Sequence, residues 1–385
     1  DPKDILAVGY SRDRFCFRKP PTAYFSDILS SDYDLIVRSE LQELCDIIDS
    51  DYPDTSCLPL LVSKILKKAE QNTPDLVGLK KRINYILVKY INELLTESEI
   101  KKFLPNCPII GLNHHKTHAA TYLCSDYEHA AIITWDGRGE FDTTILWEGC
   151  GEEIVRKEEI LHPNSLGAFY EIFSEYVGFD RITGPGKLMG LASYGDTRFV
   201  DIFSELIITN DSKFDFKFDP DFLSYSQSER LAVRDSLEKI IGPSRQKNEK
   251  LNDYHKAIAF AAQHTLENVA FKLIDYAKKK LNTENFVFSG GVALNCVMNE
   301  RIRQRCGVDI FLLPPCGDDG TSLGAAILLK QKYADGKNKK VVYTDTYGTR
   351  NSKNKVREYL KKNKFIFHKA SPANVAKLIH KNEII

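Results

Sequence analysis

The sequence lacks a net charge, a long hydrophobic run and any closely spaced pair of cysteines. Lys and Arg together number 53, as do Asp and Glu, so the formal net charge is zero. This balance gives no reason to expect a nucleic-acid partner or an anionic membrane surface. No apolar run approaches the roughly 20 residues that span a bilayer, and no secretory signal precedes Ile5. We therefore expect a cytoplasmic protein that binds no membrane.

The cysteines are also uninformative as ligands or cross-links. All nine are scattered along the chain without a CxxC pair. This pattern favours reduced thiols and argues against both a disulfide framework and a zinc ribbon.

The 385 residues, of which 43% are hydrophobic, are enough for two or three domains or for one large duplicated domain.

Two histidines four residues apart, His114 and His118, begin the most informative stretch. On a helix this spacing places both imidazoles on one face, where their nitrogens can converge on one ion. An apolar strand follows and runs into Asp136, whose carboxylate is well placed to join them. Two nitrogens and one oxygen form an open site for Zn²⁺ or Fe²⁺. The alternative is an ordinary surface helix, because the HxxxH spacing is common.

Apolar periodicity predicts strands alternating with helices. Strands are expected at 4–9, 130–135, 143–147, 154–160, 285–289 and 310–313. Helices are expected within 34–104, at 166–176, at 253–280 and up to Leu329. The three strands between 130 and 160 form an antiparallel meander, residues 183–195 include a glycine loop, and 210–250 are a polar surface insertion. Strands that end in Gly/Asp turns, with helices between them, indicate an α/β fold with ligands at the carboxyl ends of the strands.

Two glycine-containing segments in the first half are candidates for anion contacts. Gly137, Arg138 and Gly139 follow Asp136 and form either a phosphate-wrapping nest or a plain hairpin turn. Lys187 lies among three glycines, which suits an anion contact, although a lone lysine is more often solvated.

Two further turns in the second half follow predicted strands. The double glycine Gly290-Gly291 at a strand-to-helix turn lets the backbone approach a flat or phosphorylated ligand. Either Asp318 or Asp319 could supply a fourth metal ligand, and Asp319 is also suited to cap the following helix.

Six segments occur in one order across residues 111–326: Asn113–Ala120, Asp136–Glu140, Ser165–Tyr170, Gly186–Gly195, Phe288–Cys296 and Pro315–Gly320. Through these segments the chain resembles the NodU/CmcH-type O-carbamoyltransferases. The resemblance implies a duplicated actin-like domain, of the RNase H-like group (ASKHA) that includes sugar kinases and heat-shock chaperones. It is similar to the catalytic domain of the tRNA threonylcarbamoyl transferases. This domain would cover 1–340 in two halves, about 1–250 and 251–340, before the start of a truncated YrdC-like domain at 341–385.

The resemblance also implies a site and a reaction. By motif match the metal ligands are His114, His118, Asp136 and Asp318, with His118 and Asp136 as catalytic residues. The metal is Fe²⁺, with Zn²⁺ or Mn²⁺ as alternatives. ATP would be contacted by Gly137, Arg138, Gly139, Lys187, Gly290, Gly291, Asn295 and Gly317. A YrdC-like domain makes carbamoyl-adenylate from carbamoyl phosphate and ATP, and the metal-bearing domain passes the carbamoyl group to a hydroxyl of a sugar or natural product. A homodimer is left open.

Three places depart from the family pattern. Asp13 stands in place of a His-Asp loop, Ala257 replaces a frequent acid, and Pro185-Gly186 replace a frequent glutamate before Lys187. They keep open a nucleotide-binding module of the same fold without transfer activity. A tRNA threonylcarbamoyl transferase-like enzyme is a third hypothesis, which the neutral charge disfavours. A sugar kinase would leave the HxxxH pair without a role.

Overall fold

The computed structural model describes residues 5, 7–11, 63, 64, 67, 100–139, 142–218, 227–246, 249–333 and 351–381. Two compact units divide the chain, Asp1–Val341 and Val342–Ile385, and each is described by itself. Asp13 lies outside the described residues, as does most of the helical region expected at 34–104.

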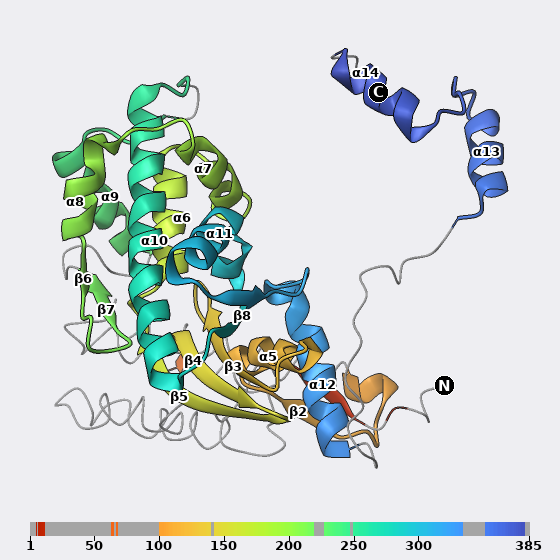
Figure 1. Cartoon of the computed structure of the whole chain (residues 1–385), viewed down its shortest axis with the longest axis horizontal. Coiled ribbons are helices and arrows are strands. Elements are labelled where there is room, and N and C mark those ends of the chain that lie inside the picture. Colours follow the sequence, from red (N-terminus) through yellow and green to blue (C-terminus); the bar gives the residue numbers. More distant parts are fainter. Residues whose placement is uncertain are drawn as a thin grey trace. The chain divides into compact units, whose positions relative to one another are not determined.

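A five-stranded sheet, in the order β5-β4-β3-β8-β9, lies at the centre of the described part of the first unit (Figure 1). Its strands are β3 (His129–Trp135), β4 (Asp142–Cys150), β5 (Glu153–Leu161), β8 (Asn285–Ser289) and β9 (Asp309–Phe311). β3, β4 and β5 pair antiparallel, which confirms the predicted meander. β8 and β9 continue the sheet in parallel from β3. A separate parallel pair joins β1 (Val8–Tyr10) to β2 (Ile109–Gly111).

Alternate side chains of β3 face two different cores. Residues 131, 133 and 135 belong to the larger core, with α6 (Leu166–Tyr176) and α10 (Asp253–Leu281). Residues 130 and 132 belong to a smaller core on the other face, which includes Ala119 of α5 (His114–Ala119). A strand covered on both faces is expected to be largely apolar, as residues 130–133 of this one are. The predicted helices at 166–176 and 253–280 are confirmed.

The glycine-rich segment 183–195, expected to include a loop, is mostly a helix, α7 (Gly184–Ala192). Pro185 lies in its first turn, where the missing N–H would have no helical partner. Leu188 and Ala192, one turn apart, are buried in the larger core, and α7 contacts α10. The loop prediction is wrong because burial of this apolar face outweighs the low helix propensity of glycine.

Residues 210–250, expected to be a surface insertion, contribute to the larger core. β6 (Ile207–Thr209) pairs with β7 (Phe216–Phe218), and the side chains of Phe214, Phe216 and Phe218 are buried. Helix α9 (Gln227–Ile241) adds Ile241 to the same core. The prediction is wrong because alternate phenylalanines create an apolar strand face inside an otherwise polar segment.

The other described elements of the first unit are η3 (Ala120–Cys124), η4 (Thr197–Phe199), α8 (Val200–Glu205), η6 (Gly291–Leu294), α11 (Cys296–Cys306), η7 (Asp318–Gly320) and α12 (Thr321–Tyr333). In the second unit, residues 351–381 form α13 (Lys353–Lys362) and α14 (Pro372–His380). Among the described helices, none has the length and apolarity needed to cross a membrane. The mixed α/β class is confirmed, whereas the duplicated actin-like architecture and the YrdC-like domain stay predictions.

Candidate metal and nucleotide site

The predicted metal ligands meet where the parallel strands β3 and β8 end. Thr134 of β3 is in register with Ser289 of β8, so the two strands end side by side. Asp136 follows the last residue of β3, and Gly290 follows the last residue of β8. Gly290 has a φ of 99°, and a Cβ atom on it would lie 2.2 Å from the carbonyl oxygen of Trp135. Glycine at this position therefore permits the close approach of the two strand ends.

Helix α5 brings two histidines to the same place. Asn113 caps this helix by accepting a hydrogen bond from the backbone N–H of Lys116 at 2.9 Å. The ring centroids of His114 and His118, one turn apart, are 4.7 Å from each other. Their ligand atoms and those of Asp136 and Asp318 all lie within 4.8 Å of one another. The structure thus brings together all four residues that the sequence nominated as metal ligands.

The distances among these side chains fit a single metal ion. Nε2 of His114 lies 3.0 Å from Oδ2 of Asp136 and 3.3 Å from Oδ1 of Asp318. Nε2 of His118 lies 3.4 Å from each of these oxygens, and the two Nε2 atoms are 3.2 Å apart. Ligands bound at about 2.1 Å are separated by about 3.0 Å at a right angle and about 3.4 Å in a tetrahedron. The four groups could therefore hold a divalent ion without rearrangement of the backbone.

A hydrogen-bond chain behind His118 directs its Nε2 atom into the cluster. Nδ1 of His118 lies 3.0 Å from Oγ of Ser289, and that hydroxyl donates to the carbonyl oxygen of Cys316 at 3.3 Å. Because the hydroxyl hydrogen is used in this way, Ser289 accepts the Nδ1–H of His118. Nε2 then keeps the lone pair that a metal ion requires.

A second chain does the same for His114. The Thr117 hydroxyl donates to the carbonyl oxygen of His114 at 2.6 Å, so it accepts from Oγ of Ser11 at 2.9 Å. Ser11 in turn accepts from Nδ1 of His114 at 3.2 Å, across 103 positions of sequence. Both histidines thus have an orienting hydroxyl on the side away from the cluster.

The intervening histidine, His115, has a structural role. It is fully buried, and its Nε2–H donates to the carbonyl oxygen of Asp142 at 3.0 Å. Its Nδ1 accepts from the Thr134 hydroxyl at 2.9 Å, and Trp147 donates its indole N–H to that hydroxyl at 3.0 Å. Burial lowers the pKa of His115 to about 3. His115 is therefore a neutral imidazole with both ring nitrogens hydrogen-bonded, to Thr134 of β3 and Asp142 of β4, and neither nitrogen is left to bind an ion.

The carboxylates raise the pKa values of the two outer histidines. Burial lowers the pKa of His114, but hydrogen bonds to Asp136 and Asp318 outweigh it and raise the pKa to about 10. The pKa of His118 is raised for the same reason, also against its burial. Burial would raise the pKa of Asp136, yet its hydrogen bonds with the histidines hold it well below its usual range. A metal ion entering this cluster must therefore displace protons.

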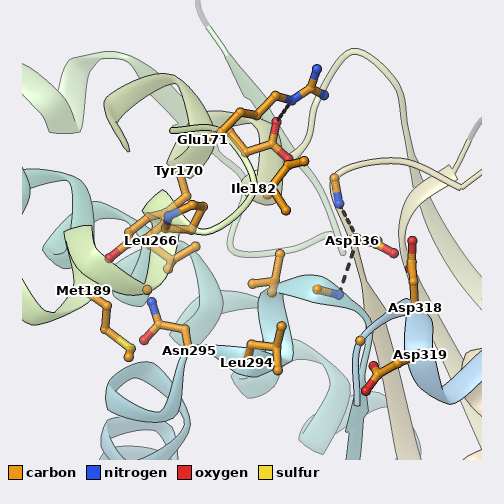
Figure 2. A pocket seen from close by; sticks show the side chains of 18 residues that line it. Asp136, Tyr170, Glu171, Ile182, Met189, Leu266, Leu294, Asn295, Asp318 and Asp319 are labelled. Carbon is orange, nitrogen blue, oxygen red and sulfur yellow. Dashed lines mark hydrogen bonds and ion pairs between the residues drawn. The ribbon is translucent and has the colours of Figure 1, made fainter. Parts of the chain in front are cut away.

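A cavity of about 640 Å³ adjoins the cluster and includes Asp136 and Asp318 in its lining (Figure 2). Oδ1 of Asp136 accepts hydrogen bonds from the backbone N–H groups of Gly137 at 2.7 Å and Gly291 at 3.3 Å. These bonds turn Oδ2 toward the histidines. The side chain of Asp318 is 75% exposed, so the cluster is open on this side. Much of the remaining wall is apolar, formed by Ile182, Pro185, Met189, Leu266, Val292 and Leu294.

The predicted nucleotide-binding residues divide into two groups. Four of them line the cavity: Gly137, Gly291, Asn295 and Gly317. The other four lie outside its lining: Arg138, Gly139, Lys187 and Gly290. Nζ of Lys187 lies 3.5 Å from Oδ2 of Asp180, and the N–H of Gly290 donates to the carbonyl oxygen of Cys316 at 2.7 Å.

A buried polar network fixes the helices behind the cavity. Oε1 of Gln263 accepts from the Tyr170 hydroxyl at 2.6 Å and from Nδ2 of Asn295 at 2.8 Å. Nε2 of Gln263 donates to Glu267 at 2.6 Å, and Glu267 pairs with Arg301. Because Tyr170 and Asn295 line the cavity, this network sets its shape by joining α6, α10 and α11.

Comparison with known proteins identifies the family. The family model described as carbamoyltransferase N-terminus matches residues 60–327. The chain belongs to this carbamoyltransferase family. The predicted membership is thereby confirmed.

Relatives of this chain include an uncharacterized protein of Synechocystis. It is 33% identical over 228 residues, which cover 59% of this chain and 37% of the relative. The nodulation protein NolO of Bradyrhizobium diazoefficiens is 28% identical over 228 residues, covering 57% of this chain and 38% of NolO. The chain therefore spans less than half the length of these relatives. Full-length HypF in its phosphate- and nucleotide-bound form matches with a TM-score of 0.32 and 16% identity, covering 60% of this chain and 44% of HypF. A TM-score of this size does not establish a shared fold.

Sequence reasoning missed several residues that shape the site. Ser11 and Ser289 orient the histidines, and Glu171 and Arg181 line the cavity. Ser289 could have been found from its place directly before the double glycine. No local pattern distinguishes the other three. Ala257, the departure that raised doubt about acceptor binding, is fully buried in α10 and lies outside the cavity lining.

Proposed function

We propose that this chain is the metal- and nucleotide-binding part of an O-carbamoyltransferase. It would transfer a carbamoyl group from carbamoyl-adenylate, made from carbamoyl phosphate and ATP, to a hydroxyl of a sugar or natural product. The observation that carries the proposal is the His₂Asp₂ cluster, both of whose carboxylates, Asp136 and Asp318, also line a cavity of about 640 Å³. Family membership supplies the carbamoyl chemistry.

A divalent ion held by His114, His118, Asp136 and Asp318 would supply Lewis-acid polarisation of the carbamoyl carbonyl. The residues around the ion site orient its ligands and the reacting group. Gly137 and Gly291 hold Asp136 in the orientation that faces the histidines. The cluster's open side directs the reacting group toward the cavity, since Asp318 is largely exposed there.

The cavity suits the adenosine part of the donor. An adenine ring is flat and largely apolar on its faces, and the wall formed with Met189, Leu266 and Leu294 is apolar. Asn295 adds an amide at the same wall, held in place by Gln263. Formation of carbamoyl-adenylate is assigned to a YrdC-like domain beginning near residue 341, as the resemblance implies.

The first experiment measures metal content and ATP affinity of anaerobically purified wild type and His118→Ala. His129→Ala is the matched control, because His129 lies on β3, is 38% exposed and pairs with Glu148 away from the cluster. We expect about one ion per chain in wild type and control and none in His118→Ala. Elemental analysis also distinguishes Fe²⁺ from Zn²⁺ and Mn²⁺, all of which suit these ligands to differing degrees.

The second experiment supplies chemically prepared carbamoyl-adenylate, so that the result does not depend on a separate activating domain. The metal-loaded protein should release AMP and carbamoylate a hydroxyl acceptor, and His118→Ala should not. If the protein binds ATP but none of the samples contains metal, the transferase proposal is rejected. That result would favour the nucleotide-binding module instead.

A further inference from the structure

Two buried polar side chains lie behind the wall of the cavity that faces away from the metal cluster. Tyr170 and Asn295 belong to this wall, across the cavity from Asp136 (Figure 2). Behind them, Gln263 is 4% exposed and Glu267 is 1% exposed, and neither lines the cavity. Gln263 and Glu267 can therefore act on a ligand only through the residues of the wall.

The carboxylate of Glu267 fixes the orientation of the Gln263 amide. Glu267 pairs with Arg301, and a carboxylate in such a pair only accepts hydrogen bonds. Oε1 of Glu267 lies 2.6 Å from Nε2 of Gln263, so the nitrogen of the amide, and not its oxygen, must face it. Oε1 of Gln263 then accepts from the Tyr170 hydroxyl at 2.6 Å and from Nδ2 of Asn295 at 2.8 Å.

The backbone fixes the Asn295 amide from the opposite end. Oδ1 of Asn295 accepts from the N–H of Met298 at 2.9 Å, as the N-cap of α11. It also accepts from Nε2 of Gln263 at 3.1 Å, so the two amides form a closed pair of hydrogen bonds. A backbone N–H only donates and Glu267 only accepts, so a single arrangement of the two amides satisfies every group between these ends. Reversal of either amide would leave buried donors or acceptors unpaired.

The amide of Gln263 holds two wall residues that come from different elements. Tyr170 belongs to α6, Gln263 to α10, and Asn295 caps α11. A change at Gln263 therefore disturbs Tyr170 and Asn295 together. Because this wall lies across the cavity from Asp136 (Figure 2), the disturbance should affect the binding of the nucleoside and leave the reacting group in place.

We infer that Gln263 and Glu267 are positioning residues for nucleotide binding. Glu267 fixes the amide of Gln263, and that amide holds Tyr170 and Asn295 in the arrangement that receives the nucleoside. The inference rests on the proposed function and adds to it two residues that touch no ligand.

The test uses exchanges between glutamine and glutamate, which preserve the shape of each side chain. The variants are Glu267→Gln, Gln263→Glu and the double variant that carries both exchanges. The matched controls are Glu300→Gln and Gln304→Glu. Gln304 donates to Glu300 at 2.7 Å along one turn of α11, and both residues are exposed and outside the cavity lining. The controls thus change the same kind of contact away from the wall.

Four quantities are measured for each protein. Metal content shows that the cluster has formed, and urea unfolding gives the fraction of folded protein. Calorimetry gives the dissociation constant for ATP. AMP release from chemically prepared carbamoyl-adenylate, with methyl glucoside as hydroxyl acceptor, gives KM and kcat separately.

Glu267→Gln should weaken ATP binding by about 10-fold, because an amide at this position can donate as well as accept and no longer fixes Gln263. Gln263→Glu should weaken ATP binding further, since two carboxylates then face each other. The double variant should bind ATP more tightly than Gln263→Glu, because a donor again faces the carboxylate. In each case metal content should be unchanged, and KM for carbamoyl-adenylate should rise while kcat stays within about 2-fold.

ATP dissociation constants that agree between Glu267→Gln and Glu300→Gln overturn the inference and leave the proposed function standing. A loss of ATP binding that only follows the loss of metal or of folded protein also overturns it, because that result assigns the network to packing alone. A folded Gln263→Glu that binds ATP as tightly as the double variant has the same consequence. Where Gln263→Glu does not fold, Glu267→Gln decides.

The proposed function fails by different results. Wild type that binds no ATP rejects the nucleotide part of that proposal, and the inference with it. Wild type that binds ATP but releases no AMP from carbamoyl-adenylate rejects the transfer reaction, and the ATP dissociation constants of the variants then decide the inference.

Discussion

Replacing Ser289 by alanine is the sharpest test of how the cluster is oriented. Ser289 is 1% exposed, and its hydroxyl is the partner of Nδ1 of His118 at 3.0 Å. Alanine removes this partner and leaves the four proposed ligands unchanged. The carbonyl oxygen of Cys316 keeps the N–H of Gly290 at 2.7 Å, so the loss is confined to the histidine.

The size of the effect follows from the buried Nδ1–H of His118. An unsatisfied buried donor costs about 1–3 kcal/mol. The imidazole can avoid this cost by moving its proton to Nε2, which is the atom that must bind the metal. Outer-shell partners of ligating histidines contribute about 10- to 100-fold to metal affinity. We therefore expect Ser289→Ala to raise the metal dissociation constant by about that factor, or about 1.4–2.7 kcal/mol.

Ser174→Ala is the matched control. Ser174 is fully buried and donates to the backbone carbonyl oxygen of Asp180 at 3.2 Å, but it belongs to α6 and not to the cluster. Competition with a chromophoric chelator under anaerobic conditions gives the metal affinity of each protein. Urea unfolding of the metal-free proteins shows what each substitution costs in stability alone. Equal metal affinities in Ser289→Ala and Ser174→Ala would refute the orienting role.

Three further predictions follow from the same geometry. Metal binding at pH 7 should release about one to two protons per ion, and the affinity for the metal should increase with pH, because the pKa of His114 is raised to about 10 and that of His118 is also raised. Calorimetry in buffers of different ionisation enthalpy measures the number of protons released, and a release of none would contradict the prediction. His115→Ala should lower the free energy of unfolding of the metal-free protein by about 2–5 kcal/mol, and unchanged stability in urea would contradict its structural role. Gly290→Ala should lower the free energy of unfolding by more than about 2 kcal/mol, through backbone strain and a clash with Trp135. Gly151→Ala is the control, because Gly151 also has a positive φ but open space around it, and it should lower the free energy of unfolding by about 1 kcal/mol. Equal shifts in melting temperature would show that the close approach of the strands is unimportant.

Much of the secondary structure was predictable because the local spacing of apolar residues determines it. The β3–β4–β5 meander, α6 and α10 follow from apolar runs and glycine turns that a short window contains. The two large errors arose where burial outweighs local preference. Segment 183–195 includes a helix in spite of its glycines, and 210–250 contributes phenylalanines to the core in spite of its polarity.

The sequence by itself determined which residues could hold a metal, since the spacing of His114 and His118 and the position of Asp136 at a strand end are local properties. Only the tertiary structure decided that these groups meet Asp318, because Asp318 follows β9, and β9 joins β3 in one sheet only through the parallel pairing of β3 with β8 and of β8 with β9. It also decided that His115 is structural and that Ser11 supports His114. The tertiary structure also placed Glu171 in the cavity lining, because α6, which is attached to the turn after β3, carries this residue. Hydrogen-bond partners far apart in sequence leave no local pattern, so their roles became visible only when the chain was folded.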